Sequence, residues 1–458
     1  MEKETRMTEK VICRGAWWSA TNPDNKVLGT LTFEPPGTCE LEIDGSLIDV
    51  KTFGTQMPNI GCVYGETYEG QLCTLDGCFL ASLSFPGVNT TRIIFNTLFI
   101  GNTTIDPKND RFEYAVIDMT DLAGWMSRDP FLYSVAQKQT EVKYNPPTPA
   151  CFTVPSLQSQ LKLVSMFNIG IEYQKRHLEH SERIQILPDI KQDISWYKDV
   201  CVNSRMLMSL FVGRSVDVIS LRLVKTDAER VEYVDFCFRQ VMSGHAKALA
   251  PHEIPFAFPV ISNVFQTLVT TWFQNAAKYG ASAALSFGVS INSSMPLEFQ
   301  FLALVQGLES YHRGQGGGVY LSESEYEYIR TALVSAIPAD VEQSHRDALK
   351  KRIQYGYQHS LRRRLNDLLN KVPDKLKSRI TYGDGKFVER VINTRNFLTH
   401  RDDTCKSNAF GTRDMFNACQ GLKLLVEVLL LSNIGMPVSE LEDVMSTHNN
   451  YIMRPEIV

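Results

Sequence analysis

The stretch Arg395-Asn396-Phe397-Leu398-Thr399-His400 lies near the end of a predicted helix, Lys386 to Arg401, and helical patterns flank it on both sides. Before it, Leu297 to Arg313 carries apolar residues at the i, i+3, i+4 spacing of one helix face. After it, Thr412 to Ile434 is a strongly apolar helical segment. These patterns predict that residues 295–458 form an all-α helical bundle.

The remaining helices of this bundle are marked by their ends. Ser322 to Ile337 begins with a serine cap and early acidic residues, and Pro437 to His448 has proline in its first turn. Asp340 to Val372 is long, with a break expected near Gly356. The glycine run from Gly314 to Gly318 lacks the GK[ST] of a phosphate loop and follows a helix, so it predicts a flexible turn.

The first 294 residues have a different character. Residues 1–148 contain short β-rich runs separated by Gly, Pro, Asn and Asp, which predicts a β-rich sandwich or barrel-like domain. Residues 149–294 mix helical spacing, as in Asp193 to Phe211, with a buried strand, Val216 to Leu223. The predicted fold class is therefore α+β multidomain, with a β-rich N-terminal domain, an α+β middle region and the helical bundle.

Composition narrows the functional class. The chain has 458 residues, of which 43% are hydrophobic and 21% charged, as in soluble globular proteins. It contains no uninterrupted apolar run of the length that spans a bilayer, and Met1 to Lys10 is charged and precedes no apolar signal core. We expect a cytoplasmic protein without a membrane partner. The 10 cysteines include no CxxC pair, so we expect reduced thiols and neither a metal site nor a cofactor.

Charge is distributed unevenly along the chain. Between His345 and Arg413 there are 17 Lys and Arg against 7 Asp and Glu, a balance of +10, whereas the whole chain carries −4 and the remainder therefore −14. A basic module on an acidic body is typical of proteins that bind a polyanion. The densest cluster, Arg362-Arg363-Arg364, fits an RNA-binding site, although an ordinary solvated helix face gives the same pattern.

Residues 395–400 contain the side chains that internal RNA cleavage requires. The neighbouring 2'-OH is the nucleophile, a base takes its proton, and donors stabilise the charge on the phosphate. Histidine titrates in the useful pH range and arginine offers a fixed fork of donors. At ~100° per residue Asn396 and His400 share a helix face, whereas Arg395 and His400 lie about 140° apart. One chain offers few groups for catalysis, so we expect a two-fold axis to bring together the same residues of two chains. The alternative is that Arg395 and His400 are ordinary surface residues.

The motif and its surroundings resemble a known family. Arg395-Asn396-Phe397-Leu398-Thr399-His400 resembles the R-x4-H motif of the HEPN superfamily, in which a polar residue follows the arginine. Phe299 to His312 is similar to the first helix of the Apea-like HEPN branch. The order of Gly15-Ala16-Trp17-Trp18, a strand-rich stretch and Leu122-Ala123-Gly124-Trp125 is similar to the N-terminal domain of that branch, although these tryptophans also fit core packing.

This resemblance implies a metal-independent endoribonuclease toxin that acts as a homodimer in anti-phage abortive infection. Arg395 and His400 would be catalytic, with Asn396 in support. Glu309 would contribute from another helix, although it fits equally well as a polar residue at the end of the bundle core. Arg362, Arg363, Arg364 and Arg401 would bind RNA, with Asp402 and Asp403 partly offsetting the positive field.

The resemblance also implies partners and a rival function. The substrate would be host or phage RNA, with tRNA as one candidate, and a phage protein is one candidate trigger for the N-terminal domains. The competing class is a non-catalytic RNA-binding or dimerisation and sensor protein that uses the bundle as a scaffold. In that case Arg395 and His400 would be incidental.

Overall fold

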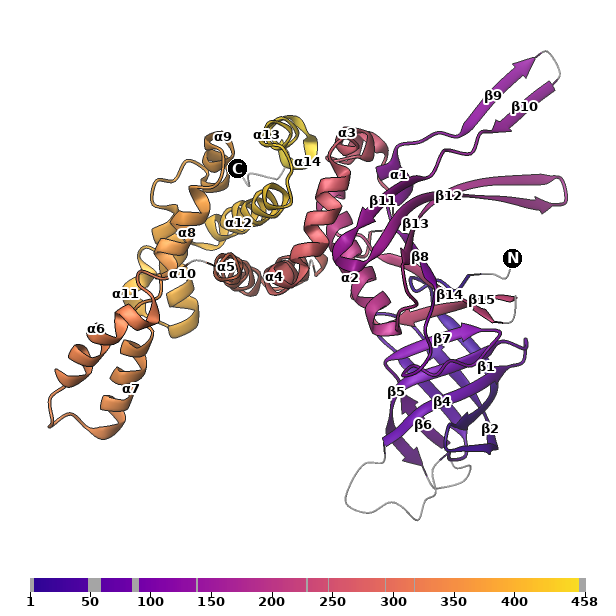
Figure 1. Ribbon diagram of the computed structural model, residues 1–458, viewed down its shortest axis with the longest axis horizontal. Coiled ribbons are helices and arrows are strands. Elements are labelled where there is room, and N and C mark those ends of the chain that lie inside the picture. The colour runs from indigo at the N-terminus through magenta and orange to yellow at the C-terminus, as the bar shows by residue number, and fades with distance from the viewer. Residues whose placement is uncertain are drawn as a thin grey trace. The chain divides into compact units, whose positions relative to one another are not determined.

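The computed structural model describes residues 4–47, 59–84, 90–136, 139–227, 230–245, 247–292, 294–316 and 318–452 (Figure 1). The chain forms two units, Met1–Gln274 and Asn275–Val458, which we call the β unit and the helical unit. Each is described by itself below.

Six strands of the β unit close into a barrel. They pair in the order β5-β4-β1-β2-β3-β6 and return to β5. Closure depends on the length of β5, because its first half pairs with β7 and its second half with β6. The strands are β1 (Val11–Ser19), β2 (Asn22–Phe33), β3 (Cys39–Asp44), β4 (Asn59–Thr67), β5 (Leu72–Ser84) and β6 (Thr90–Ile94).

Apolar residues that alternate along these strands fill the barrel. Trp17, Leu31, Leu41, Val63 and Ile93 have no exposed surface, as the period-2 alternation of half-buried strands requires. The Nε1–H of Trp17 donates to the carbonyl of Gly29 over 3.2 Å. The β-rich prediction is confirmed, and Trp17 is a core residue.

The same sheet continues beyond the barrel. After β5 the order runs through β7 (Thr97–Gly101), β15 (Arg230–Phe238), β14 (Val218–Asp227), β8 (Tyr114–Met119), β13 (Lys175–Pro188), β12 (Ser159–Glu172) and β11 (Ala150–Val154). A separate hairpin is made by β9 (Phe131–Ala136) and β10 (Gln139–Tyr144). Figure 1 shows β9–β10 and β12–β13 as two long ribbons.

The structure corrects the division expected at residue 148. Strand β8, before that boundary, pairs with both β13 and β14, which follow it. Strands β1 to β8 and the strands of the predicted middle region therefore share one sheet. Strand pairing over such long sequence separations leaves no mark in local composition, which is why the change from strands to mixed patterns looked like a domain boundary.

The helices of the β unit pack around an aromatic cluster. Trp125 in α1 has no exposed surface, lies 6.1 Å from Phe211 and 5.4 Å from Phe265 between ring centroids, and donates its Nε1–H to the Phe256 carbonyl. The helical segments are α1 (Leu122–Met126), η2 (Pro155–Leu157), α2 (Ile194–Val212), η3 (Pro251–Glu253), α3 (Phe258–Ile261) and α4 (Phe265–Ile291), which runs across the boundary between the units.

Largely buried arginine–aspartate pairs are a second feature of the β unit. In each pair a guanidinium nitrogen lies within 3 Å of a carboxylate that is at most 9% exposed. The pairs are Arg183–Asp118, Arg205–Asp217, Arg214–Asp121 and Arg222–Asp235. Each carboxylate depends on its arginine, because an unpaired buried charge is strongly unfavourable.

Asp118 predicts a pH dependence of stability. Burial raises its pKa from 3.8 to about 6, with Glu4 adding to the rise and Arg183 opposing it. The folded state therefore binds more protons than the unfolded state between about pH 4 and pH 6, so the free energy of unfolding falls as pH rises through this window, by about 3 kcal/mol at most. Urea unfolding across this range should show that fall, and Asp118→Asn should flatten it. An unchanged slope in the variant would contradict the assignment.

The helical unit confirms the predicted bundle. Its helices are α5 (Leu297–Gly314), α6 (Glu323–Ser335), α7 (Gln343–Gln354), α8 (Leu361–Leu369), α9 (Asp374–Thr381), α10 (Phe387–His400), α11 (Asp403–Lys406), α12 (Thr412–Asn433), α13 (Val438–Thr447) and α14 (Asn449–Ile452). Ser322 caps α6 in a capping box with Glu325, and the break expected near Gly356 separates α7 from α8.

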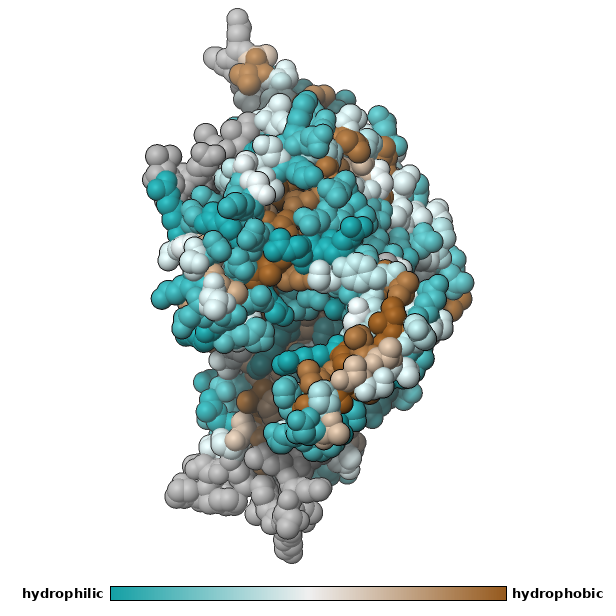
Figure 2. Space-filling model, turned by 90° about the vertical axis from the view of Figure 1, so that its left-hand side faces the viewer, coloured by the Kyte–Doolittle hydropathy of each residue, from teal (hydrophilic) through white to brown (hydrophobic). Residues whose placement is uncertain are grey.

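Helix α12 is the centre of this unit. It packs on α5 and α9, and Gly421 lets it approach α9 so closely that an added Cβ would lie 2.1 Å from the Ile380 carbonyl oxygen. By length and composition α12 could cross a membrane, but 67% of its apolar window is buried. On the side where the helical unit lies in Figure 1, hydrophilic side chains cover most of the surface, with apolar side chains in narrow bands (Figure 2).

Candidate functional site

The R-x4-H residues lie in the second half of α10. Phe387, Val391 and Thr394 bury one face of this helix, which packs on α5 and α8. Arg395 and Asn396 follow that face and are half-buried, and Arg395 Nη1 donates to Asn396 Oδ1 over 3.2 Å. This hydrogen bond ties the Arg395 guanidinium to the side chain of its neighbour.

His400 is the last residue of α10 and is exposed. The helix ends there because Arg401 adopts a left-handed backbone conformation, with φ 54°, and its N–H bonds the Phe397 carbonyl. Asp402 then caps α11: hydrogen bonds from Thr404 lower the pKa of its carboxyl, and the nearby His400 contributes in the same direction. Asp402 is thus engaged with Thr404 and leaves the imidazole open to solvent.

One copy of the chain does not pair Arg395 with His400. Since α10 continues to His400, the two residues point about 140° apart around the helix axis. The small cavity beside α10 lies at the opposite end of the helix, where Tyr382, Phe387 and Arg390 are among its lining residues. The two candidate groups are therefore surface residues of the single chain.

Glu309 lies on α5 and is engaged by a neighbour. Its Oε1 accepts from Arg313 Nη2 over 2.9 Å, and its side chain is 18% exposed. Arg313 in turn donates from Nη1 to the Gln358 side chain. The structure thus places Glu309 beside the turn that precedes α8, in contact with a cation of that region rather than in an apolar core.

The three predicted RNA-binding arginines on α8 are not equivalent. Arg362 and Arg363 are exposed in the first turn, and Arg363 also pairs with Asp367 over 3.0 Å. Arg364 is only 1% exposed, and its guanidinium donates to the His359 and Gly318 carbonyls. This corrects the prediction for Arg364, because a buried guanidinium that is hydrogen-bonded to two backbone carbonyls cannot reach a phosphate. The helical period turns the third residue of the run toward the core.

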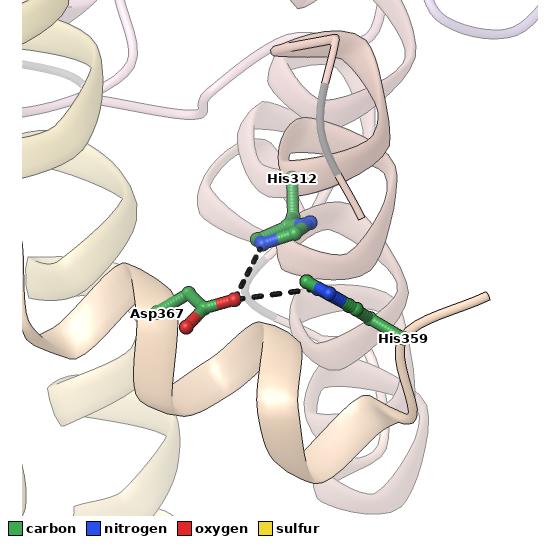
Figure 3. A group of neighbouring side chains, drawn as sticks. All are labelled: His312, His359 and Asp367. Atoms are coloured by element: carbon green, nitrogen blue, oxygen red, sulfur yellow. Dashed lines mark hydrogen bonds and ion pairs between the residues drawn. The ribbon is translucent and has the colours of Figure 1, made fainter. Parts of the chain in front are cut away.

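Arg364 also belongs to a cluster that the sequence did not reveal. His312, near the end of α5, and His359, before α8, both turn a ring nitrogen toward the same Asp367 oxygen, at 3.3 and 3.4 Å (Figure 3). Arg364 Nη1 lies 3.2 Å from the other nitrogen of His312, Nδ1. His312 is far from the other residues in sequence and meets them only because α5 packs on α8.

The hydrogen-bond donors around His312 decide whether this cluster can bind a metal ion. Two histidines and an aspartate within 4.8 Å have the composition of a zinc site. However, arginine only donates hydrogen bonds, so His312 Nδ1 must accept and Nε2 must carry the proton. Burial lowers the pKa of His312, which favours this neutral form. A protonated Nε2 cannot bind a metal, so the cluster fits a hydrogen-bonded brace better than a metal site.

Comparison with protein families assigns both units. A model described as ApeA N-terminal domain 1 matches residues 12–272, more than half of the chain, and a model described as Apea-like HEPN matches residues 302–440. The chain belongs to the ApeA family. No curated protein and no solved structure gave a significant match.

The two family matches confirm the predicted resemblance to the Apea-like HEPN family. ApeA-type HEPN domains belong to an abortive-infection nuclease family, and HEPN domains are generally ribonucleases. The match to the Apea-like HEPN model includes α10 as well as the His312 cluster. The spacing of Arg395 and His400 could be recognised in the sequence, whereas the cluster had no local signal, because His312 on α5 is distant from the residues of α8 that it meets.

Proposed function

We propose that this ApeA-family chain is a metal-independent endoribonuclease that cleaves RNA by attack of the 2'-OH on the adjacent phosphate. His400 would act as general base, Arg395 would stabilise the charge on the phosphate, and Asn396 would orient Arg395. The observation that carries the proposal is the R-x4-H pair at the exposed end of α10, inside the Apea-like HEPN match.

The geometry of α10 supports a site made by two copies of the chain. His400 is exposed, and Arg395 points to another side of the same helix, so one copy offers an incomplete site. A two-fold axis beside α10 would bring Arg395 of one protomer toward His400 of the other. Arg362, Arg363 and Arg401 would serve the same reaction by holding the RNA, and Glu309 would contribute to the catalytic site from α5. Host or phage RNA, including tRNA, would be cut in the cytoplasm. The β unit would receive the trigger, with a phage protein as one candidate.

The chemistry of the products tests this proposal. Purified protein should cut RNA in the presence of EDTA and leave 2',3'-cyclic phosphate and 5'-OH ends, which sequencing of 5'-OH ends detects. Activity per chain should rise with protein concentration where light scattering shows a dimer forming. RNA that stays intact under all these conditions would favour the competing hypothesis, that the chain is a non-catalytic RNA-binding or sensor protein.

A further inference from the structure

Residues 350–363 join α7 to α8, and we call them the basic turn. Together with Arg364 they contain six Lys and Arg and no Asp or Glu. Lys351 and Arg352 are exposed in the last turn of α7, and Arg362 and Arg363 are exposed in the first turn of α8. Tyr355 lies between these two pairs and is 57% exposed. Cations with an aromatic ring between them are typical of surfaces that bind nucleic acid.

The basic turn is held by its backbone. Tyr326 Oη donates to the Ile353 carbonyl over 2.7 Å, and Gly356 packs so close to that hydroxyl that an added Cβ would lie 2.2 Å away. The N–H of Tyr320 donates to the Tyr357 carbonyl, and an isolated bridge pairs Val319 with Gln358. Such ties hold a loop in one conformation, which lowers the entropy cost of binding.

The cluster of His312, His359 and Asp367 in Figure 3 anchors the end of the turn. The N–H of His359 donates to the Gly318 carbonyl, and Arg364 donates to the carbonyls of both residues. Asp367 contacts His312 and His359 through one oxygen and Arg363 through the other. Arg364 and Asp367 thus act as positioning residues: they fix the start of α8, from which Arg362 and Arg363 project.

We propose that the basic turn is an RNA-contact surface that grips a single-stranded segment outside the R-x4-H site. This proposal rests on the proposed function, because it takes RNA as the ligand of the protein. Lys351 and Arg352 would hold phosphates on one side of Tyr355, and Arg362 and Arg363 would do so on the other. A base would stack on Tyr355. The positive end of the α8 helix dipole lies at the same residues and favours a phosphate on this side.

The chemistry of the turn favours single-stranded RNA over other polyanions. A stacking tyrosine needs a base that is free of a duplex, which a single strand or loop provides. The neighbours Gln354, Gln358 and Ser360 are polar and offer hydrogen bonds rather than side chains that insert into lipid. Arg313, which is held at Gln358, adds a cation from α5.

Binding is measured on the full-length His400→Ala protein, so that cleavage cannot interfere. The probe is a short, unstructured, fluorescein-labelled RNA, compared with the same RNA annealed to its complement and with phosphatidylglycerol vesicles. Fluorescence anisotropy at rising KCl gives the affinity and its salt dependence. The added variants are Lys351→Glu with Arg352→Glu, and Tyr355→Ala. The control is Lys371→Glu with Lys375→Glu, two exposed lysines of the same unit, which makes the same change in net charge.

The variant with Lys351→Glu and Arg352→Glu should weaken RNA binding. It should also make the negative slope of log K against log salt shallower by about 1.4, at ~0.7 per lost phosphate contact on a single strand. Tyr355→Ala should weaken binding of the single strand by about five- to 150-fold and leave the duplex unaffected. Equal affinity in the test and control variants overturns the proposal, as does a loss confined to vesicles. If the wild-type protein leaves RNA uncut but the variants show the expected losses of binding, the proposed nuclease function is wrong. The proposal that the basic turn binds RNA is then still supported.

Discussion

The His400→Ala protein is expected to cleave RNA about 10²- to 10⁴-fold more slowly than the wild type, the range for loss of a general base. His400 is the exposed last residue of α10, so its removal should leave folding unchanged. Arg395→Ala should give a loss of similar size, because the charge on the phosphate would lose its main donor. Initial rates on a labelled RNA, with circular dichroism to check folding, measure both effects.

Two further variants separate a catalytic role from a general effect of charge. Arg395→Lys keeps the charge but not the fork of donors, so it should recover little activity. His345→Ala removes another exposed histidine of the helical unit and should be as active as the wild type. If His400→Ala and Arg395→Ala cut RNA at the wild-type rate, then the R-x4-H pair is incidental and the nuclease assignment loses its site.

The Arg214→Ala variant is expected to lower the free energy of unfolding of the β unit by about 3–5 kcal/mol. The side chain of Asp121 is 1% exposed and accepts two hydrogen bonds from Arg214, at 2.9 and 2.7 Å. Without that guanidinium, the carboxylate keeps only the N–H of Leu249 and is left largely uncompensated in the interior. Arg214 also donates to the Lys247 carbonyl, so the loop before α3 would loosen as well.

Urea unfolding followed by tryptophan fluorescence measures this effect in the β unit alone, because Trp17, Trp18, Trp125, Trp196 and Trp272 all lie within it. Arg6→Ala breaks an exposed pair with Glu9 and should change stability by less than about 1 kcal/mol. Arg214→Met combined with Asp121→Asn leaves no unpaired charge and should recover much of the loss. A change as small as that of Arg6→Ala would show that the Arg214–Asp121 pair contributes little.

Local patterns predicted the helical unit well. The spacing of apolar residues in Leu297 to Arg313, the Ser322 cap and the break near Gly356 are properties of a few neighbouring residues, and the structure has helices and ends at these places. The β unit was predicted less well. Its barrel closes through pairings such as β5 with β6 and β8 with β13, which depend on contacts between distant segments.

The candidate site divides in the same way. Arg395, Asn396 and His400 are near neighbours on one helix, so their spacing alone determined where they lie on α10. Packing decided the roles of the other residues. Arg364 looked like Arg362 and Arg363 in the sequence, but the helical period turns it inward, where it binds the carbonyls of Gly318 and His359. The sequence of such a run gives its net charge, whereas burial decides which of its side chains can contact a ligand.

The sequence by itself therefore determined the helical bundle, its caps and the R-x4-H motif, because each of these features depends on residues within a few helical turns of one another. Only the tertiary structure decided that strands from β1 to β15, apart from the β9–β10 hairpin, share one sheet and that His312, His359 and Asp367 form a brace. The physical reason is that strand pairing and buried hydrogen bonding join groups that are distant along the chain. Their partners are selected by packing rather than by local propensity.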